Sequence, residues 1–115
     1  NLNEIEKAYN LYVSAYQQDT TFYLSLLNAA MCAEALGNNN NAIFCYNKLL
    51  NIHPDVKEGY NNLSYLYFKM GNIKKSIEVN KRAIEYNPLW KDPYDNLAKT
   101  YRTINDTANA NKYYE

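Results

Sequence analysis

Residues 54–88 read PDVKEGYNNLSYLYFKMGNIKKSIEVNKRAIEYNP, and features of this stretch recur along the chain. The prolines that bound it, Pro54 and Pro88, are separated by the same step as the two glycines Gly37 and Gly71. Both glycines are preceded by an apolar residue and followed by asparagine. Because turn-forming residues recur at one fixed step, we expect a chain of internal repeats with a period of about 34 residues.

The same step predicts turns outside the quoted stretch. One period after Gly71 the chain has Asn105, and one period before Gly37 it has Asn3. Asparagine, like glycine, tolerates the left-handed backbone conformation in which many helices end. We therefore expect helix ends at all of these positions.

Between the expected turns lie stretches long enough for two helices per repeat. Apolar residues follow helical spacing at Leu63, Tyr67, Met70, Ile73, Ile77 and Ile84. Residues suited to cap the second helices are Asn38, Asn72 and Asp106. For the first helices, Asp55 with Glu58 matches a capping box, and Asp92 offers a cap with Pro93 at the first helical position. Each repeat is thus predicted to be a helical hairpin.

Residues of similar size recur at the same step and predict the core. Small residues suited to close helix crossings are Ala30, Ser64 and Ala98 in the first helices, and Ala8, Ala42, Ser76 and Ala110 in the second. Large residues expected to fill the remaining space are Tyr12, Tyr46 and Tyr114 in one register, and Leu26, Tyr60 and Tyr94 in another.

These positions resemble the tetratricopeptide repeat, a helix-turn-helix unit of the same period. The matching residues are Tyr60, Leu63, Ser64, Tyr67, Gly71, Ser76, Ala83 and Pro88. The chain departs from the pattern at Ala33, where a tyrosine is usual, at Leu49 in place of alanine, and at Asn80 in place of an aromatic residue. A slightly longer helical repeat that binds RNA would be basic and would drift out of this register, so we reject it.

The resemblance implies an all-α fold, a right-handed α-α superhelical solenoid of stacked helix-turn-helix units with seven helices. Residues 1–22 would form the second helix of a preceding repeat, 23–56 and 57–90 two complete repeats, and 91–115 a repeat truncated in its second helix. Because the chain opens and stops within this pattern, we interpret it as a fragment of a longer protein of the family.

Composition argues against several classes of function. The 12 basic and 12 acidic residues cancel, which gives little reason to expect nucleic acid or a charged membrane as partner. No run approaches the roughly 20 consecutive apolar residues of a membrane span. Cys32 and Cys45 lack metal-ligand spacing and are expected to pack without a disulfide, and the single histidine, His53, is expected to be solvated in a loop. We find no catalytic motif and expect neither enzyme activity nor a cofactor or metal.

Three asparagines, Asn28, Asn62 and Asn96, recur at the repeat spacing. Each precedes a predicted core residue by one position, which turns it about 100° away from the buried stripe and toward the expected concave groove. A side-chain amide has both a donor and an acceptor and complements a peptide group. The ladder therefore predicts contacts to the backbone of an extended peptide. Two alternatives stay open, a hydrated surface position and hydrogen bonds between adjacent helices.

Neighbours of these amides on the first helices are predicted to line the same groove. They are Leu24, Leu27, Met31 and Glu34 in the first repeat, Glu58, Asn61, Tyr65 and Lys69 in the second, and Asp92, Asp95, Lys99 and Arg102 in the third. We expect a ligand with an apolar anchor near Met31 and Tyr65 and with polar groups toward the third repeat. Positions that hold a carboxylate clamp in co-chaperones of this family are occupied here by Leu27, Met31, Asn62, Asp92 and Asn96, which provide too little positive charge.

The leading hypothesis is a protein-interaction scaffold that binds a protein or peptide segment. The alternative is a structural spacer, or a module that self-associates end to end through its terminal helices.

Overall fold

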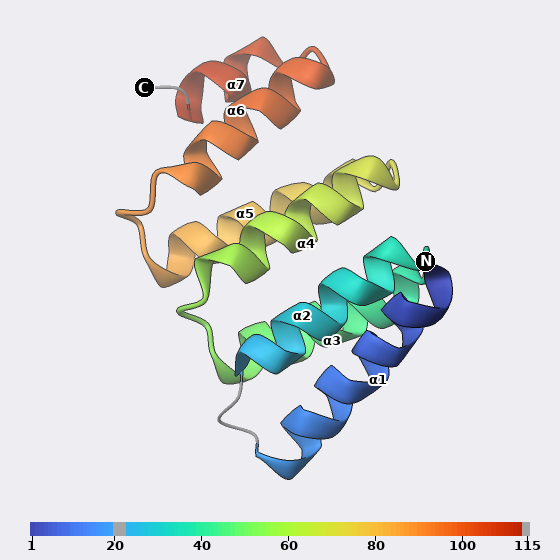
Figure 1. The fold of residues 1–115 in the computed structure, drawn as a ribbon. Coiled ribbons are helices and arrows are strands. Elements are labelled where there is room, and N and C mark those ends of the chain that lie inside the picture. Colours follow the sequence, from blue (N-terminus) through green and yellow to red (C-terminus); the bar gives the residue numbers. More distant parts are fainter. Residues whose placement is uncertain (20–22, 114–115) are drawn as a thin grey trace. The chain divides into compact units, whose positions relative to one another are not determined.

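The computed structural model describes residues 1–19 and 23–113, and within these ranges it contains seven helices and no strand (Figure 1). The helices are α1 (Leu2–Gln18), α2 (Tyr23–Ala35), α3 (Asn39–Ile52), α4 (Lys57–Lys69), α5 (Ile73–Tyr86), α6 (Asp92–Thr103) and α7 (Thr107–Tyr113). The predicted all-α class and helix number are confirmed. The assignment of repeat boundaries stays a prediction.

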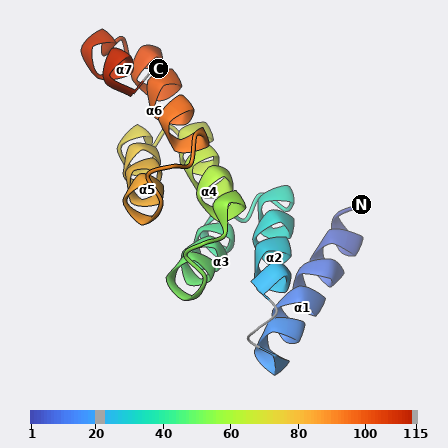
Figure 2. The same ribbon diagram turned by 90° about the vertical axis from the view of Figure 1, so that its left-hand side faces the viewer.

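The chain divides into two compact units, Asn1–Gly59 and Tyr60–Glu115. In the first unit α2 packs against both α1 and α3. In the second unit α6 packs against both α5 and α7. Helices α4 and α5 lie side by side (Figure 2), joined by a buried hydrogen bond of 2.8 Å from the Ser76 hydroxyl to the carbonyl of Ser64.

Helices α2, α4 and α6 end in the same left-handed turn. Gly37, Gly71 and Asn105 have φ values of 78°, 82° and 62°. At Gly71 the next amide, that of Asn72, donates to the carbonyl of Tyr67 at 2.9 Å, the pairing of a Schellman motif. These predicted turns are confirmed. The turn expected at Asn3 is wrong, because α1 already begins at Leu2 and is capped by the side chain of Asn1.

We expect Gly71→Ala to lower the free energy of unfolding by about 1–2 kcal/mol, the cost of a left-handed backbone for a residue with a Cβ. Space is not the cause, because a Cβ at Gly71 would have no atom within 4 Å. The matched change, Asn105→Gly, should stabilise the protein because it removes the same strain. Urea unfolding of both variants checks the pair, and equal effects of one sign would contradict the explanation.

The predicted caps are confirmed for the second helices. Asn38, Asn72 and Asp106 each accept a hydrogen bond from the backbone amide three residues later, at 3.2–3.3 Å. Both caps predicted for the first helices are wrong. Helix α4 begins at Lys57 after the buried Val56, which places Asp55 too early, and the cap position of α6 is Lys91, so that Asp92 lies in the first turn.

The predicted core is largely confirmed. Buried residues at the repeat spacing are Leu26, Ala30, Ala42, Tyr46, Tyr60, Ser64, Ser76, Ala98 and Ala110. Ala8 and Tyr12 on α1 are only partly buried, as is Tyr94 at the start of α6, and Tyr114 lies outside the described residues. Met70, which continues the helical spacing of Leu63 and Tyr67, follows the end of α4 and is 45% exposed.

Candidate functional site

A pocket of about 470 Å³ lies in the second unit among α4, α5 and α6. Its lining residues are Asn61, Asn62, Ser64, Tyr65 and Phe68 from α4, Ser76 from α5, and Asp92, Asn96, Lys99 and Thr100 from α6. Six of the residues predicted to line the groove are therefore brought together here, namely Asn61, Asn62, Tyr65, Asp92, Asn96 and Lys99.

Helical spacing places these side chains on one face of each helix. On α6, Asp92, Asn96 and Lys99 follow the i, i+4, i+7 pattern, which lines them up along the pocket. Their orientation is fixed by Leu97, which follows Asn96 and is fully buried. On α4, the buried Leu63 follows Asn62 in the same way.

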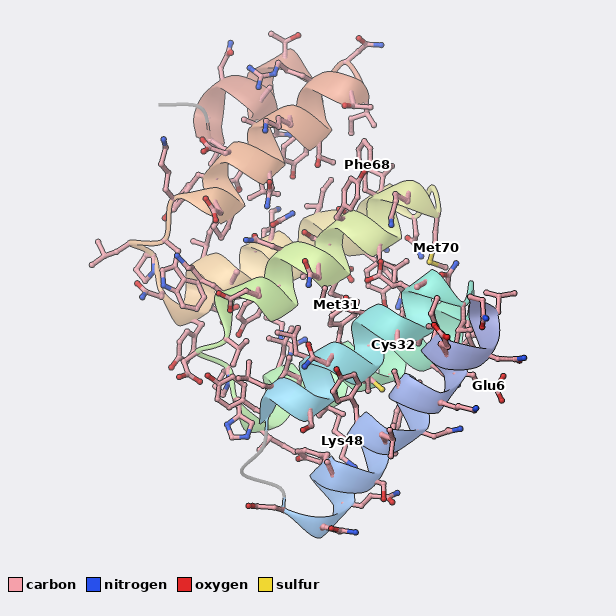
Figure 3. The ribbon with its side chains drawn as sticks, in the orientation of Figure 1. Glu6, Met31, Cys32, Lys48, Phe68 and Met70 are labelled. Atoms are coloured by element: carbon pink, nitrogen blue, oxygen red, sulfur yellow. The ribbon has the colours of Figure 1, made fainter. Side chains whose placement is uncertain are left out.

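The pocket combines an aromatic part with separated charges. The Tyr65 side chain is 60% exposed, and Phe68, labelled near the end of α4 in Figure 3, is half-buried. The Lys69 ammonium lies 4.9 Å from the centre of the Tyr65 ring, within the range of a cation–π interaction. Asp92 and Lys99 are both exposed and about two helical turns apart on α6. An apolar side chain flanked by charged groups of both signs fits this surface.

Asn62 and Asn96, the two amides of the predicted ladder that line this pocket, differ in their hydrogen bonds. The Nδ2 of Asn96 donates to Oδ1 of Asn61 at 3.2 Å and to Oδ1 of Asn80 at 3.4 Å. For Asn96 the structure therefore agrees with one of the two alternatives left open by the sequence, a side-chain amide that forms hydrogen bonds between helices. The Asn62 side chain makes no hydrogen bond to another described residue, and its donors and acceptor are open to a ligand.

The third amide of the predicted ladder, Asn28, lies in the first unit. It lines a separate pocket of about 250 Å³ together with Met31, Cys32 and residues of α1 (Figure 3). Met31 is 50% exposed, whereas Leu27 is only 7% exposed and has little surface left for a ligand. None of the other predicted residues lines the pocket of the second unit. Leu24, Glu58, Lys69 and Arg102 are exposed, and Glu34 and Asp95 are half-buried.

Sequence reasoning missed Asn80 as part of this site. Asn80 is 1% exposed, and its amide bonds to Asn96 and, at 3.2 Å, to the carbonyl of Ser76. The signal was present, since Asn80 occupies a register that is otherwise aromatic, as at Tyr46. The prediction also missed four residues that line the pocket, namely Ser64, Phe68, Ser76 and Thr100.

The cysteines and the histidine are packed side chains. Both thiols are free, and burial raises the pKa of Cys32 and of Cys45, although Tyr9 and Lys48 partly offset the effect at Cys45. The prediction of a solvated His53 is wrong, because its ring stacks at a tilt on Tyr23 with 5.2 Å between centres, and its Nε2 is buried. Within residues 1–19 and 23–113, no group of three His, Cys, Asp or Glu side chains is placed to hold a metal. None of the helices in these ranges combines the length and the apolar character of a membrane-spanning segment.

Two stretches of the chain match models of a known protein family. Two models, each described as "Tetratricopeptide repeat", match residues 24–55 and 58–88, which together make up more than half of the chain. The chain belongs to the tetratricopeptide repeat family.

Individual tetratricopeptide relatives extend this result. The chain is 35% identical over 60 residues to the tetratricopeptide repeat-containing protein trd-1 of Caenorhabditis elegans. That match covers 52% of the chain and 8% of the relative, so the chain spans a small part of that protein.

Solved structures show the same fold. A crystal structure of MamA superposes with a TM-score of 0.76 at 22% identity over 96% of the chain and 65% of MamA. A second MamA structure has a TM-score of 0.78 at 19% identity, over 95% of the chain and 60% of that structure. The fold class is thus the α-α solenoid of tetratricopeptide repeats. Repeats of this family form scaffolds for protein interaction, and the family match supports this general role for the chain.

Proposed function

We propose that the pocket among α4, α5 and α6 binds an extended peptide segment of a protein partner. The observation that carries the proposal is the half-buried Asn62, whose amide has no hydrogen bond to another described residue and lines the pocket beside the exposed Tyr65. An amide can donate to a peptide carbonyl and accept from a peptide N–H, so Asn62 can hold a backbone of any sequence.

The neighbouring side chains provide selectivity for the segment. Tyr65 and Phe68 offer an apolar contact for one side chain of the ligand. Asp92 and Lys99 favour a basic group toward the start of α6 and an acidic group toward its end. Asn28 and Met31 in the first unit remain predicted contacts of the peptide. We also propose that this chain is one part of a longer repeat protein, and that its repeats span about residues 23–56, 57–90 and 91–115.

We expect Asn62→Ala to weaken peptide binding about tenfold, because about 1.4 kcal/mol is lost with hydrogen bonds to the ligand backbone. Stability should hardly change, because Asn62 has no hydrogen-bond partner among the described residues. The probe is a peptide selected from a displayed random library on the wild-type chain. Fluorescence anisotropy of that labelled peptide measures the affinity.

The matched control is Asn111→Ala, the same substitution at an exposed position of α7 outside the pocket lining. It should leave the affinity unchanged. A library that yields no peptide, or a selected peptide that ignores Asn62→Ala, contradicts the proposal. Light scattering tests the alternative function of self-association. The measured molar mass of a self-associating module would rise with protein concentration, and it would do so equally in the wild-type chain and in Asn62→Ala.

A further inference from the structure

Three side-chain amides in the second unit form one continuous hydrogen-bonded chain. Asn61 donates to Oδ2 of Asp92 at 3.2 Å, Asn96 donates to both Asn61 and Asn80, and Asn80 donates to the backbone carbonyl of Ser76 at 3.2 Å. We call Asn61, Asn96 and Asn80 the amide chain. It links the first turn of α6 to the buried Asn80 on α5, and two of its members, Asn61 and Asn96, line the pocket.

The direction of every bond in the amide chain is set at its two ends. The carbonyl of Ser76 can only accept, so Asn80 must turn its nitrogen toward Ser76 and its oxygen toward Asn96. The carboxylate of Asp92 likewise only accepts when ionised, so Asn61 turns its nitrogen to Asp92 and its oxygen to Asn96. Asn96 meets two oxygens and must present its nitrogen to both.

Asn96 can therefore accept a further hydrogen bond but cannot donate one. Both hydrogens of its Nδ2 are used, and its Oδ1 receives no hydrogen bond from the described residues. Asn62, by contrast, keeps both its donors and its acceptor. Asn62 and Asn96 are the same type of residue, yet they offer a ligand different hydrogen-bonding groups.

We propose that Asn80 is a positioning residue that fixes Asn96 as a pure acceptor, so that the pocket selects a ligand with an N–H group at this point. This inference rests on the proposed peptide function and specifies it. A peptide N–H satisfies Asn96, whereas a proline nitrogen or a ligand carbonyl at this point would leave its oxygen unpaired or repelled.

The nature of Asn80 supports this role. In the first unit the same register holds Tyr46, whose hydroxyl donates to Oε1 of Glu34 at 2.5 Å. In the second unit the counterpart of Glu34 is Phe68, which offers no acceptor to a side chain at position 80. Burying an amide is unfavourable unless it is hydrogen-bonded, and Asn80 meets this requirement through Ser76 and Asn96. The buried amide of Asn80 thus gives its donor to its own helix and its acceptor to Asn96 at the pocket.

The positioning is testable without a ligand. Asn80→Leu removes one of the two oxygens that accept a hydrogen bond from Asn96. Asn61→Ala removes the other oxygen, and Asn61 is a half-buried residue at the rim of the pocket. We expect the side-chain NH₂ resonances of Asn96 to be protected from hydrogen exchange in the wild-type chain and to exchange at least several-fold faster in either variant. If Asn80→Leu does not fold, the exchange rate of the Asn96 side chain in Asn61→Ala decides whether the proposal holds. Unchanged exchange on loss of an acceptor in a folded variant overturns the proposal.

The selectivity is tested with the peptide selected on the wild-type chain. Each backbone amide in turn is replaced by an ester, which removes one N–H donor. We expect one ester to weaken wild-type binding about tenfold, and the same ester to weaken binding to Asn61→Ala or Asn80→Leu by less than about twofold, because a freed amide can rotate. The effect should persist in Asn62→Ala. Equal tolerance of every ester overturns the selectivity, whereas failure to select any peptide refutes the proposed function and leaves the exchange experiment to decide on Asn80.

Discussion

Tyr46→Ala is expected to lower the free energy of unfolding by about 3–5 kcal/mol, as for other large aromatic residues removed from a core. Tyr46 is fully buried on α3, in the first unit. Its removal leaves a cavity and also abolishes the hydrogen bond from its hydroxyl to Glu34 on α2. Urea unfolding followed by circular dichroism measures the loss.

The matched control is Tyr46→Phe, which keeps the ring and removes only the hydroxyl. We expect it to lower the free energy of unfolding by about 1–2 kcal/mol, because the half-buried carboxylate of Glu34 loses a charge-assisted hydrogen bond. If Tyr46→Phe were as destabilising as Tyr46→Ala, the contribution of Tyr46 would lie in the hydrogen bond and the cavity explanation would be wrong.

Features set by a few neighbouring residues could be predicted from the sequence. The turns at Gly37 and Gly71 need only a left-handed residue at the end of a helix, and the caps at Asn38 and Asn72 reach three residues along the chain. Both depend on local geometry, so their recurrence at the repeat period was enough to place them.

The cap expected at Asp92 shows where local reasoning fails. Asp92 is followed by Pro93, a favourable helix start, yet α6 begins at Asp92 itself and the carboxylate accepts a hydrogen bond from Asn61 on α4. The partner is 31 residues away in sequence. A tertiary contact of this kind has no local signal in the sequence.

The candidate site has the same division between what helical spacing predicts and what it does not. Spacing along α4 and α6 predicts that Asn62, Tyr65, Asn96 and Lys99 face one side, and one pocket does contain them. Whether an asparagine there is free to bind depends on a third helix. Asn80 on α5 decides this for Asn96, and its only trace in the sequence is a polar residue in an aromatic register.

Leu97→Ala is expected to lower the free energy of unfolding by about 2–5 kcal/mol and to disturb the pocket at the same time. Leu97 is fully buried on α6 in a cluster with Tyr101 and Ala110, against which Ile77 and Ile84 of α5 pack. Its loss loosens α6 from α5, and Asn96, one residue before it, should lose the protection provided by Asn61 and Asn80.

Hydrogen exchange followed residue by residue can locate this effect. Because units of a repeat protein interact mainly with their nearest neighbours, exchange in Leu97→Ala should rise first in α6 and α7, and in Tyr46→Ala first in α2 and α3. Leu97→Met is the control, since a swap of similar volume usually costs less than about 1.5 kcal/mol. If Leu97→Ala raised exchange equally in all helices, the two units would unfold as one cooperative block, and a ligand bound at the second unit would stabilise the first unit as well.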